Sequence, residues 1–221
     1  MRPCLRPSLF AAALLACALA LADGFSSASP SKAAGPAIAI PRGQAIRVDG
    51  KIGLGEWQNA IALPISVAPG WIVHVLVKHD EANLYVAFVN LQHGSSRLYP
   101  EVMIDSPDLR SASWLTGQWW LHASYNLCEG DGAFNVYRRD GTFLCSHSKS
   151  GWEANNPPQP GGVTEFRISF AKLQLASRPG TVFGLAFDVT NATGDAKQIW
   201  RFWPAAAQLA VPRTWGEAVL R

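Results

Sequence analysis

A short segment in the middle of the chain alternates between apolar and hydrogen-bonding side chains. From Gln118 onward, the apolar set is Trp119, Leu121, Ala123 and Tyr125. The other set is Trp120, His122, Ser124 and Asn126. Because successive residues of a β-strand point to opposite faces of a sheet, the first set is predicted to face a core and the second to face water or a ligand.

An indole within a row of polar side chains suits one class of ligand. The ring of a sugar has an apolar face that stacks on an indole, and hydroxyl groups that pair with planar polar side chains. The second face therefore predicts a sugar-binding surface. The alternative is that Trp120 only covers a sheet edge or a loop.

Other segments with the same two-residue period are expected to position this strand. They lie between turn residues, at 71–78, 83–91, 99–105, 133–138, 164–169, 182–190 and 198–203. The chain of 221 residues is 48% hydrophobic, with 19 Gly and 15 Pro, which is typical of a globular β protein rather than a helical bundle. Helix is expected only at 55–60 and 170–175. We predict an all-β fold, a β-sandwich of two antiparallel sheets of jelly-roll or immunoglobulin-like type, with one or two short helices.

The N-terminal residues have the features of a secretory signal. Arg2 and Arg6 precede an apolar run, and Ala20-Leu21-Ala22 provides a small-residue cleavage site. We therefore expect a signal peptide at 1–22, a flexible linker at 23–36 and one domain at 37–221, in a secreted or periplasmic protein. A lipid anchor on Cys17 and a membrane span are the alternatives, although the apolar run is short for a span.

Two cysteines remain after such cleavage, Cys128 and Cys145. In an oxidising compartment such a pair predicts a disulfide, and free buried thiols are the alternative. A metal site that adds His122 and His147 has no spacing typical of zinc, so no metal is expected. The net charge of +3 without a basic cluster makes nucleic acid an unexpected partner.

Six motifs, in this order along the chain, resemble the family 9 carbohydrate-binding modules. They are VDGKIGLGEW at 48–57, VKHDEANLYVAFVN at 77–90, EVMIDSP at 101–107, TEFRISFAKLQL at 164–175, GLAFDVTNATGD at 184–195 and WP at 203–204. The resemblance implies a monomeric β-sandwich that binds glycans without cleaving them, in support of polysaccharide recognition or carbohydrate catabolism. It also allows a structural calcium ion, although no D-x-D type cluster requires one.

The resemblance also implies site residues. A glutamate of the family's site falls on Glu101, and a polar sugar-contacting strand falls on the alternating set described above. The family's two sandwiching tryptophans have no counterpart at 95–98 or 205–210. Trp120, Tyr99 or Trp152 would then supply the stacking surface. The predicted carbohydrate site is Trp120, Glu101, His122, Ser124 and Asn126, with Tyr99 and Arg97 at its rim, and no catalytic residue.

Three other functions remain open on the sequence. A glycoside hydrolase needs two opposed carboxylates, for which Glu101, Asp105, Asp131, Glu153 and Glu165 are candidates. A haem-binding or redox module of the cell envelope would use Met103 and His122 as an axial pair. A plain structural protein of the cell envelope would need neither a pair of opposed carboxylates nor an axial pair of haem ligands.

Overall fold

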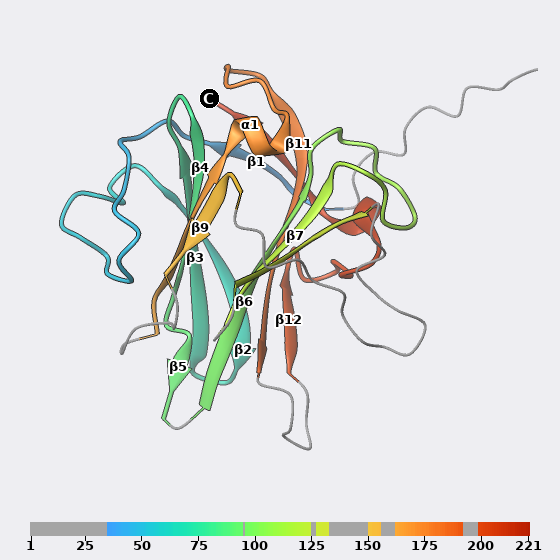
Figure 1. The fold of residues 1–221 in the computed structure, drawn as a ribbon. Coiled ribbons are helices and arrows are strands. Elements are labelled where there is room, and N and C mark those ends of the chain that lie inside the picture. Colours follow the sequence, from blue (N-terminus) through green and yellow to red (C-terminus); the bar gives the residue numbers. More distant parts are fainter. Residues whose placement is uncertain (1–34, 95, 125–126, 133–149, 156–161, 192–198) are drawn as a thin grey trace, which may run out of the picture.

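Two β-sheets pack face to face in the computed structural model, which describes residues 35–94, 96–124, 127–132, 150–155, 162–191 and 199–221 (Figure 1). The larger sheet has eight strands in the described part of the chain: β1 (Ala37–Ile40), β5 (Gln92–His93), β6 (Ser96–Asp105), β7 (Gln118–Ala123), β8 (Leu127–Asp131), β11 (Val182–Asn191), β12 (Trp200–Trp203) and β13 (Gly216–Leu220). The smaller sheet has five: β2 (Ile61–Ala68), β3 (Trp71–His79), β4 (Asn83–Val89), β9 (Trp152–Ala154) and β10 (Thr164–Ser169). The predicted all-β sandwich is confirmed.

Alternating apolar residues on both sheets form the core between them. Phe88 of β4 is fully buried, and its ring centroid lies 5.8 Å from that of Phe166 on the neighbouring strand β10. It lies equally far, at 5.8 Å, from Phe187 of β11 in the opposite sheet. Leu121 and Ala123 of β7 belong to the same buried cluster, and Trp119 packs against it. The predicted inward face of this strand is therefore confirmed for these three residues.

The larger sheet is not purely antiparallel, because its outermost pair runs parallel. β1 pairs with β13 in register from Ala37 opposite Glu217 to Ile40 opposite Leu220. The first strand of the domain thus covers the edge that the last strand would otherwise expose.

The segment that precedes β2 folds over the outer face of the smaller sheet. Glu165 of β10 is buried there, and its Oε2 accepts hydrogen bonds from the backbone N–H groups of Asp49 and Gly50 at 3.0 and 2.9 Å. Its Oε1 accepts from Trp57 Nε1 at 3.1 Å. Burial raises the pKa of Glu165 despite these donors. The helix expected at 55–60 is wrong, because consecutive turns hold Trp57 over this carboxylate instead.

Helix in the described residues is limited to single turns. α1 (Phe170–Leu173) confirms the helix predicted near this point, and Ser169 Oγ caps it by accepting from Lys172 N. A 3-10 turn covers Pro212–Thr214. Within the described ranges, the helices are too short to cross a lipid bilayer. The strand predicted at 133–138 lies outside the described residues.

A second cover lies over one end of the outer face of the larger sheet. Ala207, Leu209 and Trp215, from the segment between β12 and β13, pack with Met103 of β6 and Trp120 of β7. The residues of β6, β7 and β11 that follow along the same face carry polar side chains. That part of the face holds the candidate site.

Candidate functional site

Strand register aligns one polar row across the outer face of the larger sheet. Glu101 of β6 lies opposite His122 of β7 on one side and Asp188 of β11 on the other. The row continues to Phe202 of β12 and to Cys128 of β8. Because neighbouring strands are about 4.8 Å apart, five strands span about 19 Å, which is long enough for several sugar rings.

Glu101 is the centre of this row. It is 2% exposed, and each of its oxygens lies within hydrogen-bond distance of a ring nitrogen. Oε2 accepts from Trp120 Nε1 at 2.6 Å, and Oε1 lies 2.8 Å from His122 Nδ1. The rings of Trp120 and His122 stack on each other, with centroids 5.3 Å apart and planes at 19°. The three side chains are therefore held as one unit.

Trp120 lies on the predicted face but not in the predicted environment. Its side chain shares the outer face with Glu101 and His122, as alternation predicted. The expectation that its ring is open to solvent or ligand is wrong, because the residue is only 3% exposed and packs with Met103 and Trp215. Trp120 supports Glu101 here rather than offering a free aromatic surface.

His122 carries the most accessible group of the unit. Its side chain is 18% exposed, and Nδ1 is engaged with Glu101. Nε2 has no hydrogen-bond partner among the described residues. The Tyr99 ring centroid lies 6.5 Å from that of His122, and Tyr99 is buried. One nitrogen of His122 is thus fixed and the other is available.

The remaining predicted residues flank this unit. Arg97 lies near the start of β6 and Ser124 directly follows β7, and both are half-buried. Asn126 lies outside the described residues. The structure therefore brings Glu101, His122 and Trp120 into contact, places the other described residues on the same two strands, and leaves the contact of each with sugar a prediction.

Asp188 is a residue of the site that the sequence analysis missed. It is completely buried, and neither carboxylate oxygen has a hydrogen-bond donor in the described structure. Burial raises the pKa of Asp188 well above its ordinary value, and the nearby charge of Glu101 raises it further. Its place in the apolar run GLAFDVT gave no local signal, because only the pairing of β11 with β6 puts it beside Glu101.

Two aromatic residues of β12 were also missed. Trp200 and Phe202 are half-buried and pack against the outer cluster around Trp120. Trp200 lies opposite Thr190, which in turn lies opposite Tyr99. The buried Trp200 Nε1 has no partner in the described structure. Alternation in the sequence IWRFW is the signal that could have placed both rings on one face.

The carboxylates considered for a hydrolase do not belong to one surface. Glu153 and Glu165 lie on the smaller sheet, whereas Glu101, Asp105 and Asp131 lie on the larger one. Asp105 is fully buried and accepts from two backbone N–H groups of the loop that follows it. It therefore caps that loop.

The other candidate side chains in the described residues are buried in the packing of the sheets. Met103 is fully buried in the cluster with Trp215. Trp152 is buried against Phe166 with 6.1 Å between ring centroids. Cys128 is buried on β8, and Cys145 lies outside the described residues, so their pairing stays a prediction. Where the structure is described, no three His, Cys, Asp or Glu side chains gather as a metal site would require.

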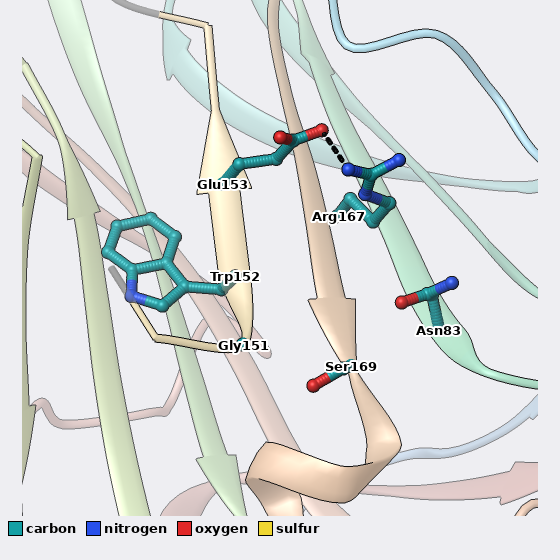
Figure 2. Close-up of a pocket in the computed structure, with 6 residues that line it drawn as sticks. All are labelled: Asn83, Gly151, Trp152, Glu153, Arg167 and Ser169. Atoms are coloured by element: carbon teal, nitrogen blue, oxygen red, sulfur yellow. Dashed lines mark ion pairs between the residues drawn. The ribbon is translucent and has the colours of Figure 1, made fainter. Parts of the chain in front are cut away.

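The smaller sheet carries a separate groove of about 390 Å³. Its lining residues are Asn83, Gly151, Trp152, Glu153, Arg167 and Ser169. Arg167 Nη2 lies 2.9 Å from Glu153 Oε1 on the neighbouring strand. Figure 2 shows this ion pair, with the Trp152 ring pointing away from it. The groove thus offers polar groups but no aromatic platform, and its two charged groups already neutralise each other.

Comparison with known proteins bears on the fold. The structure matches that of a family 9 carbohydrate-binding module (CBM9) from Caldicellulosiruptor kristjanssonii in complex with cellotriose, with a TM-score of 0.58 and 17% identity over 84% of this chain and 93% of that chain. This chain has a CBM9-like fold. The glucose complex of a CBM9 module from the same organism gives a TM-score of 0.59 at 17% identity, over 84% and 95% of the two chains.

The CBM9 resemblance predicted from the motifs is thus confirmed at the level of the fold. The sequence itself matches no protein-family model, and no curated protein matches it significantly.

Proposed function

We propose that this protein is a non-catalytic glycan-binding module and that the glycan lies across the outer face of the larger sheet. The observation that carries the proposal is the unit of Glu101, Trp120 and His122, in which a buried carboxylate holds an imidazole that is partly exposed, at 18% of its side chain. CBM9 structures with cellotriose and glucose share the fold, which supports the same ligand class.

Within this site the residues divide by role. His122 and Ser124 supply polar groups for sugar hydroxyls, with Asn126, Tyr99 and Arg97 beside them, and buried Glu101 holds His122 in place. Trp200 replaces Trp120 as the proposed stacking surface, because its ring is half-buried rather than enclosed. Hydroxyl contacts exchange for contacts with water, so stacking is expected to supply most of the affinity and the polar groups to select the sugar.

The location of the protein is part of the proposal. The apolar segment before residue 22 and the linker that follows support export to the periplasm or the medium, or retention by a lipid on Cys17. A secreted module of this kind would act in polysaccharide recognition, as a monomer bound to a soluble or surface glycan.

Trp200→Ala tests the proposed stacking surface. Affinity for cellotriose and glucose, and then for a panel of other glycans, is measured by isothermal titration calorimetry. Loss of the ring is expected to weaken binding of the preferred glycan about tenfold or more, equivalent to about 1.4 kcal/mol. Arg167→Ala, in the groove on the other sheet, is the matched control and should leave affinity unchanged. Equal affinity in Trp200→Ala and the wild-type protein, with both folded by circular dichroism, would place the site elsewhere.

A further inference from the structure

The surroundings of Asp188 disfavour the ionised form of its carboxyl group. The side chain is 0% exposed and neither oxygen has a donor in the described structure. An unpaired buried charge is strongly destabilising, and the usual response of such a group is to take up a proton. As the neutral acid, Asp188 has one O–H donor to place.

Glu101 is the acceptor for that proton. It is the register partner of Asp188 on β6, and its charge is, after burial, the next cause of the raised pKa of Asp188. Tyr99 on β6, His122 on β7 and Phe202 on β12 lie at neighbouring positions of this face. Of the two residues directly opposite Asp188, Glu101 and Phe202, only Glu101 has acceptor oxygens.

The protonation state of Glu101 determines which ring nitrogen of His122 carries the hydrogen. Trp120 Nε1 can only donate, and Asp188 as the neutral acid has one O–H to place, so Glu101 is the accepting, ionised member of the pair and has no proton to give. The 2.8 Å contact with His122 therefore needs the hydrogen on Nδ1. In the neutral imidazole this leaves Nε2 as a hydrogen-bond acceptor.

We propose that Asp188 is a positioning residue of the glycan site, which acts through Glu101 to hold His122 in the Nδ1–H tautomer, so that Nε2 accepts a hydrogen bond from a sugar hydroxyl. The inference rests on the proposed function and adds a rule of specificity to it. The ligand must donate a hydrogen bond to His122 Nε2. A sugar with fluorine in place of that hydroxyl can accept but not donate, and it should lose affinity although it has nearly the same shape.

The tautomer is measured without any sugar, by 15N NMR of histidine-labelled full-length protein at neutral pH. The wild-type protein is expected to carry the His122 proton on Nδ1. In Glu101→Gln the tautomer should reverse. Because Trp120 Nε1 can only donate, the new amide must turn its oxygen to Trp120 and its NH2 to His122 Nδ1, which moves the ring proton to Nε2.

Two variants of Asp188 separate positioning from simple packing. Asp188→Asn retains a donor to Glu101, so it should keep the tautomer and bind glycan within about twofold of the wild-type protein. Asp188→Leu fills the space without a donor, so it should give mixed tautomers and at least tenfold weaker binding.

The outcomes distinguish this inference from the proposed function. Wild-type His122 with its proton on Nε2, or as imidazolium, overturns the inference, as does a tautomer unchanged in Glu101→Gln. Because the wild-type measurement needs no variant, its adverse result overturns the inference even if a variant fails to fold. A protein with the expected tautomers that binds no glycan refutes the proposed function and with it the role of Nε2 toward sugar.

Discussion

The proton on Asp188 makes a quantitative prediction for stability against pH. An aspartate in an unfolded chain has a pKa of about 3.9, whereas the pKa of buried Asp188 is raised in the folded protein. Between these two values the native state binds one proton more than the unfolded state. The free energy of unfolding should therefore fall as pH rises, by up to about 1.4 kcal/mol per pH unit. The contribution is fully present below pH 3.9 and is lost as pH rises toward the folded pKa.

Asp188→Asn removes this dependence because an amide does not ionise. We expect the difference in melting temperature, variant minus wild type, to grow as pH is raised from about 4. For a domain of this size the growth is up to about 3–5 °C per pH unit until the folded pKa is passed. Differential scanning calorimetry at fixed ionic strength measures it.

All other titrating groups are common to the two proteins, so their contributions largely cancel in this difference of melting temperature. Glu153→Gln is the matched control, because it makes the same carboxylate-to-amide change at a half-exposed position on the other sheet. If the melting temperatures of Asp188→Asn and the wild-type protein run parallel from pH 4 to pH 8, Asp188 is ionised in the folded state and the reasoning about His122 fails.

Two further predictions concern buried charges that connect the layers. Glu165→Ala leaves three N–H donors of the 49–57 segment without their acceptor. It should lower the free energy of unfolding, measured by urea titration, by about 3 kcal/mol. A loss under about 1 kcal/mol would mean that water replaces the carboxylate. Lys172 Nζ lies 2.9 Å from Glu129 Oε2 and 4.2 Å from the centre of the Trp119 ring, with 7% of the side chain exposed. Lys172→Met should lower the free energy of unfolding by about 3–5 kcal/mol, because it leaves the buried Glu129 carboxylate without its cation. Adding Glu129→Gln should restore part of that loss. An equal loss in the single and the double variant would argue against an unpaired charge.

Local alternation predicted which way side chains point but not what covers them. It assigned Leu121 and Ala123 to the core and His122 to the opposite face, and the structure agrees. It could not predict the burial of Trp120, because the cover comes from Ala207, Leu209 and Trp215, more than eighty residues along the chain. Periodicity describes one strand, whereas cover depends on tertiary packing.

Sheet register explains the other misses. Asp188 looks like a polar exception in an apolar strand, and its meaning appears only when β11 pairs with β6. Strand β2 was not predicted although Ala62, Pro64 and Ser66 alternate outward, because proline usually argues against a strand. It is tolerated here because β2 is the first strand in the order of the smaller sheet, where one side needs no backbone donor.

The parallel pairing of β1 with β13 has a mechanical consequence. A pull on the backbone between residue 36 and Arg221 draws the two strands in opposite directions along their own axes. The four residue pairs from Ala37 opposite Glu217 to Ile40 opposite Leu220 are then loaded together in shear instead of being unzipped one after another. If the N-terminal side is tethered to a cell surface and the bound polysaccharide drags on the domain, the strands that close the sheet are also those best oriented to resist the force.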